Sequence, residues 1–223
     1  MLILLDLDGT LAATAPDIVR SINLLLAESG VARIDAGAAA KHVGSGAGAE
    51  MLIRGAFAHS GRDLPQAEVM RLLARYFEVY FDNLCVESRL YDGCVEALDR
   101  LAAAGHRLAV CTNKPTSHAR ALMEQLGVAD RFAAICGRDL FAAHKPDARH
   151  VQGTVAEAGG PGDGVVLVGD SETDFAAARN AGIPLILARF GYGAEAVLKL
   201  GPDAVIGAFH ELPAVIDSLR LPA

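Results

Sequence analysis

The sequence predicts an α/β fold in which helices cover a parallel sheet and a helical insertion follows the first strand. Two observations carry this prediction. Short, uninterrupted apolar runs recur along the 223-residue chain, and amphipathic stretches separate most of them. Roughly a hundred residues lie between the first two strong runs, although a helical crossover needs only about thirty.

Six apolar runs are candidates for the strands. Buried parallel strands are apolar without alternation, because helices cover both of their faces. The four clearest runs are Leu2–Leu7, Arg107–Thr112, Gly164–Gly169 and Pro184–Ala188, and the weaker ones are Ala133–Cys136 and Asp203–Ile206.

Helical patterns follow several of these runs, and each of them stops at a glycine. Asp92–Ala104 precedes Gly105, Pro115–Leu126 precedes Gly127, and Thr173–Ala181 precedes Gly182. Glycine is the preferred residue just beyond a helix end, and Pro115 suits a first helical turn. The alternation of strand and helix predicts a Rossmann-like parallel sheet with helices on both faces.

The long gap after the first strand contains helical patterns and no convincing strand. The clearest patterns are Asp17–Glu28, Glu50–Ala58 and Gln66–Asn83. We therefore expect a core domain of residues 1–12 and 89–223, with a helical cap domain of residues 13–88. A cap inserted there would lie above the carboxyl ends of the strands, where open α/β sheets bind ligands.

The amino-acid composition argues against several classes of binding partner. Hydrophobic residues make up 52% of the chain and charged residues 21%, and the net charge is −7. This charge argues against nucleic acid or an anionic membrane, and no run approaches the roughly 18 apolar residues of a membrane span. The four cysteines form no CxxC pair and the histidines show no zinc spacing, so we expect reduced thiols, a cytoplasmic location and no zinc.

Two carboxylates end the first apolar run. The run Leu2–Leu5 continues directly into Asp6-Leu7-Asp8-Gly9-Thr10. Residues two apart on a strand point to the same side, so these acids would repel each other unless a cation lies between them. A hard divalent cation such as Mg²⁺, which prefers oxygen ligands, would resolve this conflict.

Three further polar clusters follow other predicted strands. Thr112 and Asn113 stand at the end of the Arg107–Thr112 run, Lys145 precedes a later helix, and Asp170 and Asp174 follow the Gly164–Gly169 run. The carboxyl ends of parallel strands share one edge, so these groups are expected to converge. Phosphoryl transfer requires acidic groups that bind a metal ion, together with hydroxyl, amide and ammonium groups that bind the phosphate. A carboxylate can also act as the nucleophile, through an aspartyl-phosphate.

These four clusters, in this order, resemble the four motifs of the haloacid dehalogenase superfamily of phosphohydrolases. The resemblance covers the whole chain, including a helical cap between the first and second motifs. Within the superfamily, four stretches are similar to bacterial phosphoglycolate phosphatases: residues 42–46, 109–115, 168–174 and 190–193.

The resemblance implies a role for each motif residue. Asp6 would attack phosphorus, and Asp8 would protonate the leaving alkoxide and then deprotonate the hydrolytic water. Mg²⁺ would be bound by the Asp6 carboxylate, the Asp8 main-chain carbonyl and Asp170. Thr112, the Asn113 amide and Lys145 would hold the phosphate, with Asp174 supporting the metal site or Lys145.

The sequence departs from the superfamily pattern in two places. Ala13-Thr14 replaces a common Asp-Ser after the first motif, and Ala148 replaces a proline after the third. The first change removes an optional acid, and the second leaves open where the following helix begins. Neither change touches the proposed catalytic residues.

Substrate contacts from the cap are a separate prediction. Gly44, Ser45 and Gly46 belong to a glycine-rich stretch that mimics a dinucleotide fingerprint, but no strand precedes it. We expect a loop that covers the active site and approaches a small substrate closely. Arg54 could bind a substrate carboxylate or could be an ordinary solvated helix residue, and Lys41 is expected to be a surface residue.

The function expected from these features is Mg²⁺-dependent hydrolysis of a small phosphate monoester, 2-phosphoglycolate to glycolate, by a monomer or small homo-oligomer. The enzymatic alternatives are a phosphomutase of the same fold or a phosphatase for another small metabolite, such as a sugar phosphate or pyrophosphate. The non-enzymatic alternatives are a receiver-like phospho-acceptor and an inactive binding module.

Overall fold

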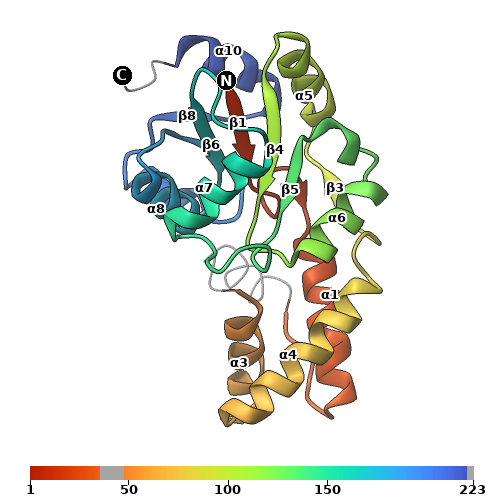
Figure 1. The fold of residues 1–223 in the computed structure, drawn as a ribbon. Helices are drawn as coiled ribbons and strands as arrows, with labels where there is room; N and C mark the ends of the chain where they lie inside the picture. Colours follow the sequence, from red (N-terminus) through yellow and green to blue (C-terminus); the bar gives the residue numbers. More distant parts are fainter. Residues whose placement is uncertain (36–47, 220–223) are drawn as a thin grey trace.

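The computed structural model describes residues 1–35 and 48–219 of the chain. Two parts are visible: a sheet flanked by helices, and a group of helices below it (Figure 1). The helices of this second group come from the segment that follows the first strand. The predicted α/β fold with a helical insertion after that strand is therefore confirmed.

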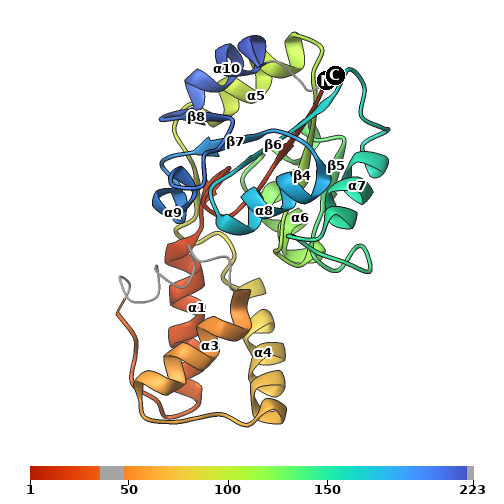
Figure 2. The same cartoon turned by 90° about the vertical axis from the view of Figure 1, so that its left-hand side faces the viewer.

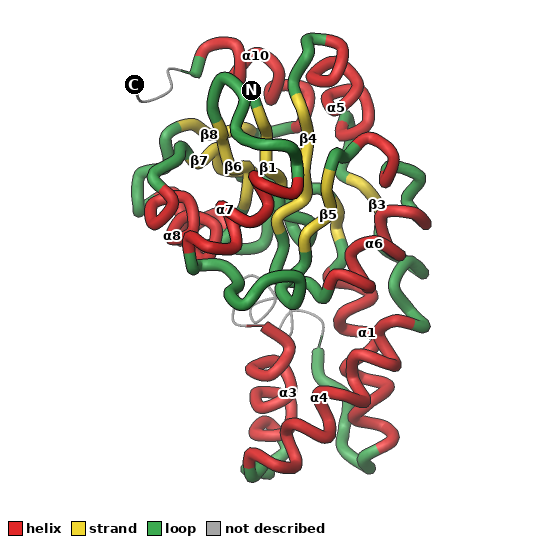
Figure 3. Tube along the Cα trace, in the orientation of Figure 1, coloured by secondary structure: helices red, strands yellow, loops and turns green. Residues whose placement is uncertain are grey.

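The sheet is parallel and has the strand order β5-β4-β1-β6-β7-β8, with β1 (Leu2–Leu5) at its centre (Figure 3). The other strands are β4 (Arg107–Cys111), β5 (Ala134–Cys136), β6 (Val165–Gly169), β7 (Leu185–Ala188) and β8 (Ala204–Ile206). The chain moves outward from β1 first in one direction and then in the other. This reversal beside β1 is where open α/β sheets bind ligands.

Alternate strand residues form two apolar layers. Ile3 and Leu5 face one layer, and Leu2 and Leu4 face the other. The first layer contacts α5 (Cys94–Ala103), α6 (Thr116–Gln125) and α10 (Leu212–Ser218). The second layer contacts α7 (Ala148–Glu157), α8 (Glu172–Ala181) and α9 (Ala194–Leu198). Short 3₁₀ turns lie elsewhere, at Ala129–Arg131 and Phe209–Glu211. Helices on both faces explain why the strands are apolar throughout.

The insertion has an apolar core of its own. The described part of the insertion contains the helices α1 (Ala15–Glu28), α3 (Gly48–His59) and α4 (Gln66–Phe81), and Figure 2 shows them away from the sheet. Ile22, Leu26, Phe57, Leu72 and Tyr76 are among the buried residues of this cluster. At about 25 cal/mol per Å² of buried apolar surface, such a cluster stabilises the three helices against each other.

A short antiparallel ladder joins the two parts, and the sequence analysis did not predict it. In this ladder β2 (Ala12–Ala13) pairs with β3 (Arg89–Leu90). The buried Asp17 carboxylate lies beside it and accepts hydrogen bonds from the backbone N–H groups of Glu87 and Ser88 and from the Ser88 hydroxyl. The expected boundaries of the cap, at residues 13 and 88, fall at this ladder. The division into two domains remains a proposal.

The ends of three predicted elements differ from expectation in ways that affect the site. Strand β1 ends at Leu5, so Asp6 and Asp8 lie in the turn that follows and not on the strand. Helix α6 is Thr116–Gln125, so Pro115 precedes the helix and does not lie in its first turn. Helix α7 begins at Ala148, and the Asp147 carboxylate caps it by accepting from Arg149 N, so the missing proline is not needed there.

The four cysteines are all free thiols, as expected. Among residues 1–35 and 48–219, no helix is both long and apolar enough to cross a membrane.

Candidate active site

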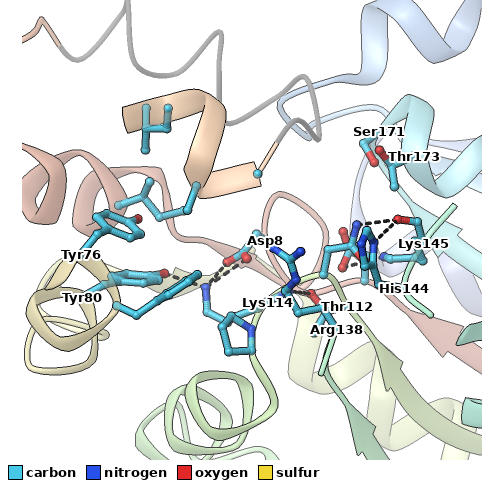
Figure 4. A pocket seen from close by; sticks show the side chains of 18 of the residues that line it. Asp8, Tyr76, Tyr80, Thr112, Lys114, Arg138, His144, Lys145, Ser171 and Thr173 are labelled. Atoms are coloured by element: carbon cyan, nitrogen blue, oxygen red, sulfur yellow. Dashed lines mark hydrogen bonds and ion pairs between the residues drawn. The ribbon is translucent and has the colours of Figure 1, made fainter. Parts of the chain in front are cut away.

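A cavity of about 210 Å³ lies where the loops after β1, β4, β5 and β6 meet the insertion. Asp6, Thr112, Asn113, Lys145 and Asp170 line it from the sheet side. Apolar and aromatic residues of α1, α3 and α4 line it from the insertion side (Figure 4). The predicted convergence of the four sequence motifs on one edge of the sheet is thus seen in the structure.

Asp6 follows the central strand directly, and its backbone N–H donates to the Val168 carbonyl at 2.9 Å. Its side chain is 12% exposed, and Lys145 Nζ lies 3.0 Å from its Oδ1. Burial raises the pKa of Asp6 to about 6, although the neighbouring Lys145 lowers it. Asp6 is therefore an acid that the fold keeps buried with a single adjacent cation among the described residues.

Lys145 lies between two carboxylates. Its ammonium donates to Asp174 Oδ1 at 2.6 Å, and its side chain is only 1% exposed. Burial opposes the charge of Lys145, but Asp174 and Asp6 outweigh it and hold the pKa above its usual range. The backbone of Lys145 is fixed as well, because its N–H donates to His150 Nδ1 and its carbonyl accepts from Asn113 Nδ2.

Asp170 follows β6 and is held by a ring of donors. Its Oδ1 accepts from the Thr10 hydroxyl at 3.0 Å, and its Oδ2 accepts from the Tyr192 N–H at 2.8 Å. Gly191 has to be glycine here, since an added Cβ would lie 2.2 Å from Asp170 Cβ. Burial, Asp174 and Asp6 raise the pKa of Asp170 to about 8.

Asp174 lies in the first turn of α8 and forms a capping box with Ser171. Its Oδ2 accepts from the Ser171 hydroxyl at 2.6 Å, and its Oδ1 accepts from Lys145. One carboxylate therefore caps the helix and also orients the lysine. Gly169 provides the room, because a Cβ there would lie 2.4 Å from Asp174 Cγ.

The carboxylates of Asp6, Asp170 and Asp174 form a group that fits a metal ion. Each offers one oxygen, and these oxygens lie within 4.8 Å of one another. Lys145 is the one cation that forms an ion pair with this group among the described residues. Asp6 Oδ1 is buried without a hydrogen bond in the described chain. Excess negative charge, the raised pKa values of Asp6 and Asp170, and hard oxygen donors together suit a divalent cation.

The Asp8 carboxylate has a different position from the one expected. It is not part of the three-aspartate group but forms an ion pair with Lys114, whose Nζ lies 2.7 and 3.0 Å from its two oxygens. The two carboxylates therefore do not point to one place, as strand geometry had led us to expect, whereas a role of Asp8 at the cation stays a prediction. The turn after β1 sends them to different lysines, because residues beyond Leu5 no longer follow strand geometry.

Thr112 and Asn113 line the cavity beside Asp6, as expected. Thr112 Oγ1 accepts from the Lys114 N–H at 3.2 Å, which stabilises the loop between β4 and α6. The Asn113 side chain donates to the Lys145 carbonyl at 2.9 Å, so it ties the second motif to the third. Their roles toward phosphate remain predictions.

The cap predictions have separate outcomes. Gly44, Ser45, Gly46 and Lys41 lie outside the described residues. Arg54 does not line the cavity: its guanidinium forms an ion pair with Glu50 at 3.1 Å and donates to the Leu64 carbonyl and the Gln66 side chain. The structure therefore brings Arg54 to its own helix and the following loop, not to the site.

The sequence analysis assigned no role to several residues that line the cavity: Tyr76, Tyr80, Lys114, Arg138 and Ser171. Lys114 stands directly after the second motif, which was the available signal. The two tyrosines are four residues apart on α4, so they share a helix face, but the sequence does not show what that face meets.

The chain matches the haloacid dehalogenase-like hydrolase family over residues 3–188. It is 44% identical over 219 residues to a phosphoglycolate phosphatase of Agrobacterium fabrum, covering 98% of this chain and 93% of the relative. It is 43% identical to a phosphoglycolate phosphatase of Mesorhizobium japonicum, covering 95% of this chain and 92% of the relative.

A solved structure gives the same picture. The crystal structure of a predicted phosphoglycolate phosphatase from Haemophilus somnus superposes with a TM-score of 0.86 and 29% sequence identity, covering 96% of this chain and 97% of that one. The family match spans the sheet core up to β7 and the whole insertion. The chain belongs to the haloacid dehalogenase-like hydrolase family.

Proposed function

We propose that this protein hydrolyses 2-phosphoglycolate to glycolate and inorganic phosphate, with Asp6 as the nucleophile and Mg²⁺ as the cofactor. The observation that carries the proposal is the position of Asp6. It lies in a small cavity, next to Lys145 and within the three-aspartate group. The full-length similarity to proteins named phosphoglycolate phosphatase supports this choice of substrate.

In the first half-reaction, an Asp6 oxygen forms a bond to phosphorus while the bond from phosphorus to the glycolate oxygen breaks. Lys145, Thr112 and the Asn113 amide hold the phosphoryl oxygens during this transfer. Buried donors of this kind stabilise the charge of the transition state more strongly than water would. Asp174 keeps the Lys145 ammonium pointed at Asp6 through the 2.6 Å ion pair.

Asp8 acts as the general acid and then as the general base. It donates one proton to the departing glycolate oxygen and later takes one from the water that attacks phosphorus. The second attack breaks the bond between Asp6 and phosphorus and releases phosphate, so the sum is ester plus water to alcohol plus phosphate. The Asp8 side chain is 23% exposed, which gives it access to the cavity and to solvent.

The Asp6 and Asp170 carboxylates and the Asp8 main-chain carbonyl would hold Mg²⁺, and Asp174 would support them. When bound, the ion neutralises negative charge on the phosphoryl group and on the aspartates. Asp170 is well prepared for this role, because Thr10 and the Tyr192 and Gly193 backbone N–H groups hold both of its oxygens in place.

A phosphomutase and a phosphatase for another metabolite remain alternatives within this family. The receiver-like phospho-acceptor and the inactive binding module have no support, because the chain belongs to a family of hydrolases. A mutase would convert one phosphosugar isomer to another and release little phosphate. We also retain the cytoplasmic location as part of the proposal, since four free cysteines suit a reducing compartment.

The test is a panel of small phosphate esters compared by kcat/KM with Mg²⁺ present. The panel contains 2-phosphoglycolate, ethyl phosphate, 3-phosphoglycerate, glucose 1-phosphate, glucose 6-phosphate and pyrophosphate, and product analysis follows both phosphate and sugar isomers. We expect 2-phosphoglycolate to have the highest kcat/KM. Faster turnover of another ester, or isomer formation without phosphate release, would contradict the proposal.

A further inference from the structure

Lys114 is a buried cation that the proposed mechanism does not use. It is 5% exposed and lines the cavity from the loop after β4. Its backbone is fixed on both sides, because its N–H donates to Thr112 Oγ1 and its carbonyl accepts from the Arg138 N–H. Gly137 packs against that carbonyl, where a Cβ would lie 2.5 Å away. These contacts fix the backbone of Lys114 beside the residues proposed to bind phosphate.

The Lys114 ammonium joins the sheet part to the insertion. It donates to both oxygens of Asp8 and to the Tyr80 hydroxyl at 2.6 Å, and it lies 4.5 Å from the centre of the Tyr80 ring. Figure 4 shows Lys114 between Tyr80 on α4 and Asp8. The three N–H donors of the lysine are thus occupied by one carboxylate and one tyrosine.

Two tyrosines beside Lys114 have O–H groups that can donate a hydrogen bond to a ligand. The Tyr80 hydroxyl accepts from Lys114, so its own hydrogen is left without an acceptor among the described residues. Tyr76 stacks on Tyr80 with ring centres 5.7 Å apart, and within the described chain its hydroxyl has no hydrogen bond. Both tyrosines line the cavity, so these hydroxyls can serve a ligand there.

Arg138 adds a second cation. It follows β5, lines the same cavity, and its side chain forms no hydrogen bond or ion pair with the described residues. We call Tyr76, Tyr80, Lys114 and Arg138 the donor cluster. Its members carry two positive charges and two hydroxyls, and the carboxylate in contact with it is Asp8.

We propose that the donor cluster binds the carboxylate of the substrate, and that Lys114 is the residue that selects phosphate esters with a second anionic group. This inference rests on the proposed function, since it names the second group of the substrate, besides the phosphate, that the site recognises. Lys114 stands one residue after Asn113, so the carboxylate of a short phosphorylated acid is bound next to the phosphate. The substrate carboxylate takes over N–H donors of Lys114 that Asp8 occupies in the free protein.

The arrangement explains selectivity physically. An ester without a carboxylate would leave the buried Lys114 charge with no anionic ligand beyond Asp8, and the partly exposed Arg138 charge with no anionic ligand in the cavity. A site built to hydrogen-bond a polar group discriminates strongly against analogues that lack it. Because the tyrosines come from α4 and the cations from the sheet part, the carboxylate would also bridge the two parts of the protein.

The test compares 2-phosphoglycolate with ethyl phosphate, in which a methyl group replaces the carboxylate. The readout is the ratio of their kcat/KM values in wild type, Lys114→Met, Lys114→Arg, Tyr76→Phe and Tyr80→Phe. We expect the ratio to fall by about 30-fold or more in Lys114→Met, to recover partly in Lys114→Arg, and to fall by about 5-fold in each tyrosine variant. Lys199→Met, at an exposed lysine after α9, is the matched control and should keep the wild-type ratio.

The outcomes separate the two proposals. If Lys114→Met slows both esters by the same factor, Lys114 only supports Asp8 and the inference is overturned. If the wild type prefers another phosphorylated carboxylate and Lys114→Met removes that preference, the inference is supported and only the choice of 2-phosphoglycolate fails. A wild-type ratio near one overturns both. Circular dichroism confirms that each variant is folded, and the tyrosine variants provide the test if Lys114→Met is not.

Discussion

Lys145 Nζ lies 2.6 Å from Asp174 Oδ1, and both side chains are buried almost completely. The same ammonium is 3.0 Å from Asp6 Oδ1, so one lysine connects the residue that follows the central strand to the first turn of α8. A buried ion pair stabilises only as long as both partners are present. This pair therefore links the stability of the fold to the geometry of the proposed nucleophile.

Asp174→Asn should lower both stability and activity. It leaves the Lys145 ammonium with only Asp6 as an anionic partner, so we expect a loss of about 3 kcal/mol in the free energy of unfolding and at least about 100-fold in kcat/KM. Urea denaturation and steady-state kinetics measure the two effects. The control is Asp99→Asn, which breaks the exposed ion pair with Arg131 and should change neither quantity. Wild-type kinetics in Asp174→Asn would show that Lys145 is oriented without Asp174.

Asp6→Asn should abolish turnover and leave the protein folded. The substitution removes a charge that burial disfavours, since the pKa of Asp6 is raised to about 6, so the fold is not expected to weaken. The amide cannot form a stable bond to phosphorus. Phosphate release reports the activity, and mass spectrometry after rapid acid quenching detects the phosphorylated aspartate in the wild type. An intact phosphorylated species in Asp6→Asn, or turnover near the wild-type rate, would remove Asp6 as the nucleophile.

Magnesium should stabilise the protein without any substrate. A divalent cation relieves the repulsion among Asp6, Asp170 and Asp174, so its binding to the folded state should raise the melting temperature in proportion to the logarithm of its concentration. EDTA should remove this shift and also inhibit turnover. Asp170→Asn should show a much smaller shift than wild type in differential scanning fluorimetry. An equal shift in both proteins would place the ion elsewhere.

His150 should make the protein sensitive to acid. Its side chain is fully buried, and burial together with the nearby Lys145 charge lowers its pKa to about 4. The unfolded chain has a histidine of ordinary pKa near 6.5, so below that pH the unfolded state binds the proton first and stability is lost as the pH falls toward about 4. The full difference corresponds to a stability change on the order of 3 kcal/mol.

The measurement for His150 is the free energy of unfolding of wild type and His150→Asn between pH 7 and pH 4. Asparagine can still accept from the Lys145 N–H, as His150 Nδ1 does, but it does not titrate. The difference between the two proteins isolates the histidine from the carboxylates, which titrate in both. Parallel curves over this interval would show that His150 does not contribute to the acid response.

The apolar runs and the acids that end them were enough to predict the sheet, the insertion and the set of residues at its edge. Strand β1 is apolar at every position because helices cover both faces, and this composition is visible without coordinates. One rule predicted which side chains would lie close together: parallel strands present their carboxyl ends at a common edge. The residues that it placed there are Asp6, Thr112, Lys145 and Asp170.

Contacts between distant parts of the chain decided the rest. The Asp8 carboxylate was expected to point to the same place as that of Asp6, but its partner is Lys114, which is 106 positions away and itself contacts Tyr80 of the insertion. Arg54 was considered for substrate binding, yet it bonds within its own part of the chain. Local patterns reveal which face of a helix is buried, whereas the direction of a side chain after a strand ends depends on turn geometry and on the charges that packing brings near it.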